Sequence, residues 1–145
     1  MDQVIVDASV GIKWFFQEHD SEKAILLLDR FQRGEIKMIV PEIFYSEVAS
    51  SYWKKVRKKL ASVSQAIESL DRIIGLSVTK YSDFELADVG LENALRFGIS
   101  VYDGLYLALA EIYLAPLITA DKVLYNACSR RFDFIELLEN VHVKD

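Results

Sequence analysis

The chain has 145 residues and a net charge of −5, and 52% of its residues are hydrophobic and 27% charged. This length predicts one domain with a substantial core, and this composition argues against a disordered chain. No apolar run approaches the roughly 18–20 residues that a membrane-spanning helix needs, so we expect no membrane association. The acid at Asp2, with no basic region before the first apolar run, argues against a signal peptide.

The chain contains a single cysteine, Cys128. One cysteine excludes a disulfide within the chain and agrees with a reducing cytosol, so we expect a cytoplasmic protein. We interpret this thiol as a small buried hydrophobe rather than as a catalytic group. The negative net charge argues against binding of nucleic acid through overall charge attraction. The placement of individual charges is therefore more informative about function than their sum.

In chain order, short apolar runs alternate with segments of helical spacing. Apolar runs predict strands over residues 4–6, 37–40, 76–79, 116–119 and either 134–137 or 141–143. Helical spacing predicts helices over 10–16, 21–34, from 41 into the bases at 54–59, 63–75, 82–98, 101–113 and 121–128. Strands that alternate with helices predict a parallel α/β sheet in one compact domain.

Several helix boundaries carry capping signals. Ser21 and Ser100 are predicted N-caps, and Gly34 is a predicted C-terminal stop. Ser82 and Glu85 have the spacing of a capping box.

Four acids stand at unusual places in this pattern. Asp7 and Asp121 each close an apolar run beside a hydroxyl residue, Glu47 lies among apolar residues early on a helix, and Asp103 begins a helix that is otherwise apolar. Strand ends and the starts of the following helices share one edge of a parallel sheet, where ligands bind in open α/β folds. We therefore expect these four acids to lie near one another.

Each acid also has an ordinary structural interpretation. Asp7 and Asp121 fit N-cap positions, and Glu47 fits an exposed helix position. Asp103 fits the first turn of a helix, where a negative charge contributes about 0.3–1 kcal/mol through the helix dipole. The occurrence of all four acids at corresponding ends of their elements favours a common site.

Carboxylates that lie close together repel one another unless protons or cations intervene. A cluster of oxygen ligands without His or Cys favours Mg²⁺ or Mn²⁺ over zinc. Such an ion polarises a phosphoryl oxygen and lowers the pKa of a bound water, so the pattern predicts metal-assisted hydrolysis of phosphodiester bonds. Ser9 and Thr119 fit hydroxyls that orient the carboxylates or the waters of the ion, and they equally fit backbone caps.

Five bases fall within six positions: Lys54, Lys55, Arg57, Lys58 and Lys59. One interpretation is a solvated helix end, where cations complement the dipole. The other is a patch that contacts the phosphates of RNA beside the acidic site.

Four motifs together resemble the PIN-domain family, and more narrowly the VapC-type ribonuclease toxins of bacterial and archaeal toxin–antitoxin pairs. They are Val4-Ile5-Val6-Asp7-Ala8-Ser9, Pro41 followed by Glu47, Tyr102-Asp103-Gly104-Leu105-Tyr106-Leu107-Ala108-Leu109-Ala110, and Thr119-Ala120-Asp121. The resemblance extends from Val4 to about Leu138. Ser50 and Ser51 stand where many members carry an Asn about one turn after the helix Glu.

The resemblance implies a single PIN-like domain of the α/β class, with about five parallel strands flanked by helices on both faces. It implies a Mg²⁺- or Mn²⁺-dependent endoribonuclease whose catalytic and metal-binding acids are Asp7, Glu47, Asp103 and Asp121. Ser9 and Thr119 would be supporting hydroxyls. The implied partners are an RNA substrate, a cognate antitoxin that reaches into the site, and a second copy in a homodimer.

Two other functions fit the same residues. A catalytically silent module of the same fold would bind RNA or a protein through the basic run, with the acids serving as caps. A phosphoryl-transfer domain of receiver or haloacid-dehalogenase-like type would use Asp7 as its nucleophile. In that case Ser9 stands where many such phosphatases carry a second acid.

Overall fold

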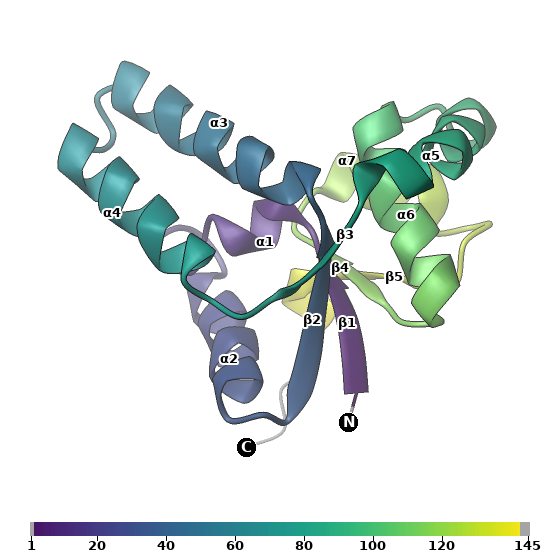
Figure 1. Cartoon of the computed structure of the whole chain (residues 1–145), viewed down its shortest axis with the longest axis horizontal. Helices are drawn as coiled ribbons and strands as arrows, with labels where there is room; N and C mark the ends of the chain where they lie inside the picture. The colour runs from purple at the N-terminus through teal and green to yellow at the C-terminus, as the bar shows by residue number, and fades with distance from the viewer. Residues whose placement is uncertain (1, 143–145) are drawn as a thin grey trace.

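The computed structural model describes residues 2–142 and places helices against both faces of one sheet (Figure 1). Five parallel strands pair in the order β3-β2-β1-β4-β5. They are β1 (Asp2–Val6), β2 (Ile36–Pro41), β3 (Thr79–Tyr81), β4 (Leu117–Thr119) and β5 (Ile135–Leu137). The predicted α/β class, with about five parallel strands, is confirmed.

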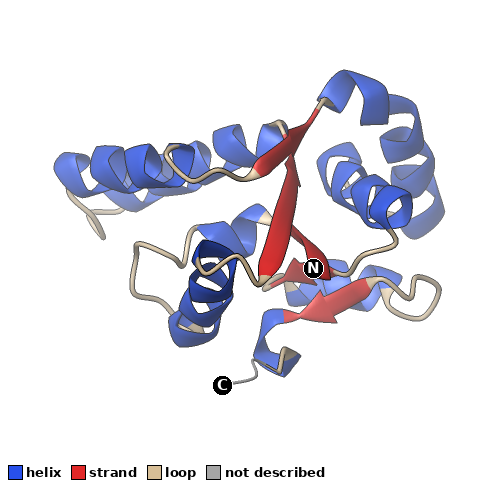
Figure 2. Ribbon diagram, turned by 60° about the horizontal axis from the view of Figure 1, so that its bottom comes forward, coloured by secondary structure: helices blue, strands red, loops and turns tan. Residues whose placement is uncertain are grey.

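The helices of the described chain cover the two faces of this sheet (Figure 2). They are α1 (Ala8–Gly11), α2 (Ser21–Gln32), α3 (Ile43–Arg57), α4 (Val63–Ile74), α5 (Asp83–Phe97), α6 (Val101–Tyr113) and α7 (Lys122–Cys128), followed by a 3-10 turn over Leu138–Asn140. Within residues 2–142, no helix has both the length and the apolar character needed to span a membrane.

The centre of the sheet brings two chain segments together that are far apart in the sequence. In the pairing of β1 with β4, Ile5 lies opposite Leu117 and Val6 opposite Ile118. All four side chains are buried, as expected for strands covered on both faces. Because the two strands are parallel and in register, the residues that follow them leave the sheet at the same edge.

The first two helices differ from prediction. The helix predicted over 10–16 is only the short α1, and Trp14 leaves the helical path to pack against Phe44 of α3, with ring centroids 6.2 Å apart. Asp20, with φ of 62°, occupies the N-cap position of α2 that was predicted for Ser21. The Ser21 hydroxyl instead donates to the Phe16 carbonyl over 3.0 Å and so closes the preceding loop. Such local bonds from a serine side chain compete with its use as a helix cap.

The third strand also lies elsewhere than predicted. β3 spans Thr79–Tyr81 rather than 76–79, because its register is set by pairing with β2, in which Ile39 faces Thr79. The last strand follows the first of the two predicted alternatives, 134–137. Residues 141 and 142 are not in a strand, and residue 143 lies outside the described residues.

The predicted caps have mixed outcomes. The Ser100 hydroxyl caps α6 by accepting the Asp103 N–H over 3.0 Å, as predicted. Ser82 occupies the N-cap position of α5 but makes no side-chain cap, so the capping box predicted with Glu85 is wrong.

A glutamate from outside α5 caps the start of this helix in place of Ser82. The α5 N-terminus is held by Oε1 of Glu42, which accepts the Asp83 N–H over 3.3 Å. A capping box forms at Ser62 and Gln65 instead, at the start of α4.

Candidate active site

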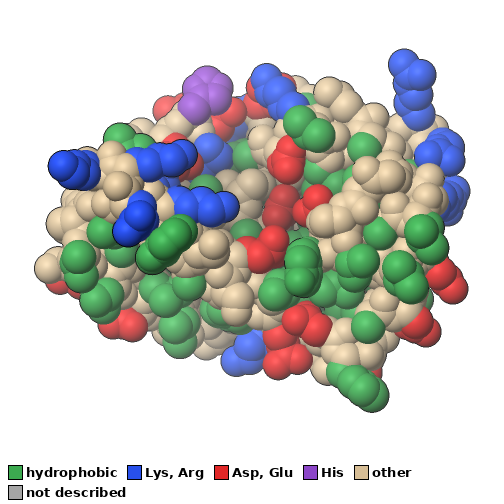
Figure 3. Space-filling model, turned by 90° about the horizontal axis from the view of Figure 1, so that it is seen from above, with side chains coloured by type: hydrophobic (Ala, Val, Ile, Leu, Met, Phe, Trp, Pro, Cys, Tyr) green, Lys and Arg blue, Asp and Glu red, His purple; other side chains and the backbone are tan. Residues whose placement is uncertain are grey.

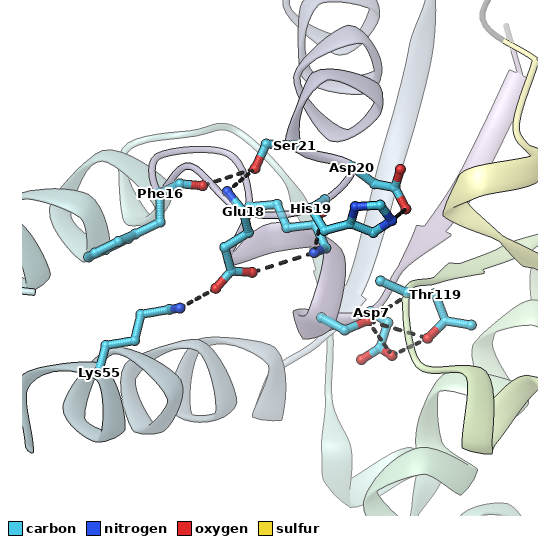
Figure 4. Close-up of polar contacts among 11 residues, drawn as sticks. Asp7, Phe16, Glu18, His19, Asp20, Ser21, Lys55 and Thr119 are labelled. Atoms are coloured by element: carbon cyan, nitrogen blue, oxygen red, sulfur yellow. Dashed lines mark hydrogen bonds and ion pairs between the residues drawn. The ribbon is translucent and has the colours of Figure 1, made fainter. Parts of the chain in front are cut away.

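Asp7 lies at the carboxyl end of the central strand β1 and is only 6% exposed. It stands at the N-cap position of α1, but its side chain caps no backbone group there. Its Oδ2 instead accepts hydrogen bonds from the Thr119 hydroxyl over 2.7 Å and the Ser9 hydroxyl over 3.0 Å (Figure 4). Oδ1 accepts none from residues 2–142, so the simple cap interpretation of Asp7 is wrong.

Ser9 and Thr119 have both of the roles that the sequence left open. Besides donating to Asp7, the Thr119 hydroxyl accepts the Asp121 N–H over 3.0 Å, and the Ser9 hydroxyl accepts the Ala120 N–H over 2.9 Å. The two hydroxyl oxygens are 3.3 Å apart. They therefore orient Asp7 and tie the turn after β4 to the end of β1.

Burial raises the pKa of Asp7 above its usual range. The hydrogen bonds from Thr119 and Ser9 act in the opposite direction, and the charge of Asp121 raises the pKa further. Asp7 is thus a buried acid that costs energy to ionise unless a positive charge comes close.

Glu47 lies on α3 and is partly buried, so its interpretation as an exposed helix residue is wrong. Its Oε1 accepts a hydrogen bond from the Tyr106 hydroxyl over 2.7 Å, whereas Oε2 accepts none from the described residues. Burial raises the pKa of Glu47 to about 7, with further upward contributions from Asp7 and Asp103, while the Tyr106 hydrogen bond lowers it. Glu47 therefore changes charge near neutral pH.

Asp103 lies in the first turn of α6. Burial raises its pKa to about 6, and the charges of Asp7 and Asp121 raise it further. An isolated acid at a helix N-terminus would be stabilised in its charged form by the helix dipole. The raised pKa shows that burial and the neighbouring acids outweigh that effect.

Close packing of two helices sets the position of Asp103. A Cβ on Gly104, the next residue, would lie 2.3 Å from the carbonyl oxygen of Gly90 on α5. Asn93 is buried and donates to the Gly104 carbonyl over 3.1 Å. Only glycine permits this approach, which holds the first turn of α6 against α5.

Asp121 is the N-cap of α7. Its Oδ1 accepts the backbone N–H groups of Val123 over 2.9 Å and Leu124 over 3.1 Å. The cap interpretation of Asp121 therefore holds. Its Oδ2 accepts no hydrogen bond from the described residues, so the same side chain also has an oxygen available for other contacts.

The four acids form one electrostatic group at the carboxyl edge of the sheet. Asp7 raises the pKa of Glu47 and Asp103, and Asp121 raises that of Asp7 and Asp103. Figure 3, which views this edge, shows acidic side chains gathered around a hollow in the middle of the face. No Lys, Arg or His in residues 2–142 forms an ion pair with any of the four.

The donors of this group are all carboxylate and hydroxyl oxygens, which fit a hard cation such as Mg²⁺ or Mn²⁺. As the side chains stand, no three acidic, His or Cys groups among the described residues are arranged to hold an ion. A bound ion would therefore draw the carboxylates together. Burial, and secondly the repulsion between these acids, raises the pKa of Glu47 and Asp103. The repulsion opposes such an approach until a cation neutralises the charges.

The basic run lies at the C-terminal end of α3, and Figure 3 shows Lys and Arg side chains at both ends of the face with the acidic hollow. Arg57 is ten residues after Glu47, or about 15 Å along the helix axis. Lys55 is not free for another ligand, because it pairs with Glu18 of the loop before α2 (Figure 4).

The other bases of the run are exposed. Arg57 lies over the exposed Trp53 ring, 5.6 Å from its centroid. Lys54, Lys58 and Lys59 form no ion pair within the described chain.

Comparison with known proteins identifies the fold family. Residues 4–129 match the family described as PIN domain. The chain belongs to the PIN domain family. The predicted resemblance is therefore confirmed at the level of the family, and the matched segment contains all four acids.

This PIN domain is similar to named relatives. It is 29% identical over 126 residues to Ribonuclease VapC3 of Pyrobaculum aerophilum, with 84% of this chain and 92% of the relative covered. Its fold matches the crystal structure of PAE2754 from the same organism, with a TM-score of 0.71, 22% identity, and coverage of 95% of this chain and 85% of the other.

Two further solved structures share the fold. A toxin–antitoxin complex from Klebsiella pneumoniae matches with a TM-score of 0.60 and 12% identity, covering 95% of this chain and 99% of the other. FitAcB from Neisseria gonorrhoeae matches with a TM-score of 0.61 and 13% identity, again covering 95% and 99%. At these identities the likeness is one of fold.

Sequence reasoning missed several residues that shape the site. Tyr106 and Gly104 belong to the motif around Asp103, but the sequence predicts no role in the site for either of them, nor for Gly90 or Asn93. The available signal was the spacing of Tyr106, three residues after Asp103, which places both on one side of a helix.

Proposed function

We propose that this PIN domain is a metal-dependent endoribonuclease of the VapC toxin type. The observation that carries the proposal is a shared arrangement of three acids. Asp7, Glu47 and Asp121 each have one carboxylate oxygen held by hydrogen bonds and a second that accepts none from the described residues. Oriented carboxylates with a free oxygen are suited to bind a cation.

The proposed cofactor is Mg²⁺ or Mn²⁺, held by Asp7, Glu47, Asp103 and Asp121. When bound, such an ion polarises a phosphoryl oxygen and lowers the pKa of a coordinated water. The chain contributes the orientation of the ligands: Thr119 and Ser9 hold Asp7, and the α7 N-terminus holds Asp121. A nearby cation would also lower the pKa of Glu47 and Asp103 and keep both ionised.

RNA as substrate is supported by the relative at 29% identity, whose name is Ribonuclease VapC3. The basic run offers a second support, because Lys54, Lys58 and Lys59 are exposed cations at the C-terminal end of α3, the helix that carries Glu47. An RNA backbone whose phosphates bind these lysines would continue along α3 toward the acidic group. Lys55 is not included among these cations, because it already forms an ion pair with Glu18.

We propose a cognate antitoxin as a protein partner, and a homodimer as the assembly. The solved structures that share this fold include a toxin–antitoxin complex from Klebsiella pneumoniae and a VapBC2 complex from Rickettsia felis bound to promoter DNA. Size-exclusion chromatography with light scattering measures the assembly directly. A monomer at micromolar concentration would contradict the homodimer.

The test of the nuclease pairs the wild type with Asp103→Asn, and uses Asp133→Asn as a matched control. Asp133 is an exposed acid outside the site, so its substitution changes the net charge equally. Each protein is purified free of partner and incubated with labelled structured and single-stranded RNA in Mg²⁺, Mn²⁺ or EDTA. We expect metal-dependent cleavage by the wild type and Asp133→Asn, and its loss in Asp103→Asn.

The folding of Asp103→Asn is checked by thermal unfolding without metal. Removing one of several mutually repelling acids should leave the apo protein at least as stable as the wild type. Equal cleavage by all three proteins, or cleavage that survives EDTA, would overturn the proposal. If the protein binds RNA but neither cleaves it nor binds metal, the catalytically silent module is favoured instead.

A further inference from the structure

The Tyr106 side chain is fully buried, yet it ends at the acidic group. Its hydroxyl donates to Oε1 of Glu47 over 2.7 Å. The backbone of Ala8, the residue after Asp7, lowers the pKa of the same hydroxyl, against the larger raising effect of burial. One phenol oxygen thus lies where the end of β1, the helix α3 and the helix α6 come together.

The position of Tyr106 on α6 links it to a third acid. Asp103 precedes it by three residues, a spacing that places both side chains on one side of a helix. The same helix therefore supplies one acid of the group and the hydroxyl that holds another. The contact of Gly104 with Gly90 lies between them and anchors this part of α6 against α5.

Burial of a tyrosine does not by itself create such a contact. Tyr52, five residues after Glu47 on α3, is also buried, and its hydroxyl has no hydrogen-bond partner in residues 2–142. The Tyr106 hydroxyl instead donates to a carboxylate, and hydrogen bonds to an ionised acceptor are among the stronger ones in proteins. This bond restrains one carboxylate oxygen of Glu47.

We propose that Tyr106 is a positioning residue of the acidic site, whose hydroxyl holds Oε1 of Glu47 and directs Oε2 to the bound ion. The proposal rests on the proposed function, because it takes Glu47 to be a ligand of that ion. Tyr106 acts through Glu47 and contacts neither the ion nor the RNA. It corresponds to the role that Thr119 has toward Asp7.

The experiment measures Mn²⁺ binding in the absence of RNA, by electron paramagnetic resonance at one fixed pH. It compares the wild type, Tyr106→Phe, and Tyr52→Phe as the matched control that removes a buried hydroxyl without a partner. Loss of a group that orients a metal ligand commonly weakens metal affinity about 10–100-fold. We expect a loss in this range for Tyr106→Phe, and an affinity within about twofold of the wild type for Tyr52→Phe, because no ligand loses a contact.

A double-mutant cycle with Glu47→Gln separates positioning from general damage to the fold. If Tyr106 acts through Glu47, adding Tyr106→Phe to Glu47→Gln should cause little further loss of Mn²⁺ affinity. Additive losses would overturn the proposal, as would wild-type affinity in Tyr106→Phe. Failure of the proposed function looks different, because the wild type itself would then bind no Mn²⁺.

A second measurement covers the case in which Tyr106→Phe does not fold. 3-Fluorotyrosine at position 106 keeps the ring and the hydroxyl, and its fluorine resonance reports the hydroxyl's surroundings. We expect Mg²⁺ to shift this resonance in the otherwise wild-type protein and to leave it unchanged in Glu47→Gln. A resonance that does not respond to Mg²⁺ in a protein that binds Mn²⁺, or a shift that persists in Glu47→Gln, would overturn the proposal.

Discussion

The Thr119 hydroxyl donates to Oδ2 of Asp7 over 2.7 Å, and the same oxygen atom of Thr119 accepts the Asp121 N–H over 3.0 Å. A single buried hydroxyl therefore connects the Asp7 carboxylate to the backbone of Asp121, two residues that follow neighbouring strands. The parallel pairing of β1 with β4 creates this connection by bringing both strand ends to one edge.

Thr119→Val tests this connection, because valine keeps the shape of threonine and lacks the hydroxyl. The buried Asp7 loses its shortest hydrogen bond and the Asp121 N–H loses its acceptor. We expect about 1–3 kcal/mol of lost stability from the unsatisfied groups and about 10–100-fold weaker Mn²⁺ binding. Urea unfolding and calorimetric titration measure the two effects. Thr119→Ser, which keeps the hydroxyl, should retain most of both, and equal losses in the two variants would count against a role for the hydroxyl.

The raised pKa values of Glu47 and Asp103 predict how stability changes with pH when divalent metal is absent. Their ordinary values are 4.5 and 3.8, and their values in the folded protein are about 7 and about 6. Between these limits the folded state binds more protons than the unfolded state. The contribution of these groups to the free energy of unfolding therefore falls as the pH rises from about 4 to about 7.

Urea unfolding in EDTA at pH 5 and pH 7.5 measures this effect. Because other groups titrate in the same range, the informative quantity is the difference between the wild type and Glu47→Gln. We expect Glu47→Gln to gain stability relative to the wild type on going from pH 5 to pH 7.5. Saturating Mg²⁺ should raise the stability of the wild type at pH 7.5. The same pH dependence in both proteins would show that Glu47 ionises normally.

Gly104→Ala should separate α5 from α6 at the start of the helix that carries Asp103. The new Cβ would lie 2.3 Å from a backbone carbonyl oxygen of Gly90, which cannot move without shifting a helix. We expect roughly 1–3 kcal/mol of lost stability and a larger relative loss of RNA cleavage, since Asp103 would move with the backbone. Thermal unfolding and cleavage assays test both expectations.

Gly90→Ala provides the comparison. Its Cβ would meet the end of the Leu105 side chain at 2.7 Å, and a side chain can rotate away more easily than a backbone can shift. This variant should therefore be less affected than Gly104→Ala. The reverse order of stabilities would contradict the close backbone contact.

Replacing Lys54, Lys58 and Lys59 together with alanine tests whether the basic run contacts RNA. We expect a raised KM, little change in kcat, and a salt dependence of binding that is weaker by roughly 2 in the log–log slope, from about 0.7 per phosphate contact on single strands. Lys55→Ala serves as the control, because its partner is Glu18. An unchanged salt slope in the triple variant would contradict RNA contact by the basic run and favour its interpretation as a solvated helix end.

Local patterns explain why much of the fold was predictable. The run before Asp7 and the run before Asp121 are both apolar and short, and the structure pairs them as adjacent strands β1 and β4. Ser100 also caps α6 as its position indicated. The two strands and the Ser100 cap depend on residues close together in the sequence, so a pattern over a few positions suffices to predict them, whereas the pairing of β1 with β4 joins distant segments.

The predictions that were wrong depend on partners from elsewhere in the chain. Ser82 and Glu85 have the spacing of a capping box, but Glu42, the residue after β2, accepts the hydrogen bond at that helix start. The edge strand β3 takes its limits from its register with β2 rather than from its own residues. No local pattern contains that information.

By itself, the sequence determined the alternation of strands and helices and the choice of Asp7, Glu47, Asp103 and Asp121 as the acids of interest. Apolar periodicity and isolated charges are properties of neighbouring residues. Only the tertiary structure decided how those acids are held: which oxygen of Asp7 faces the hydroxyls, and that Tyr106, hidden in an apolar helix, reaches Glu47. Hydrogen bonds between side chains require both groups at the right distance and angle, and that geometry exists only once the elements have packed together.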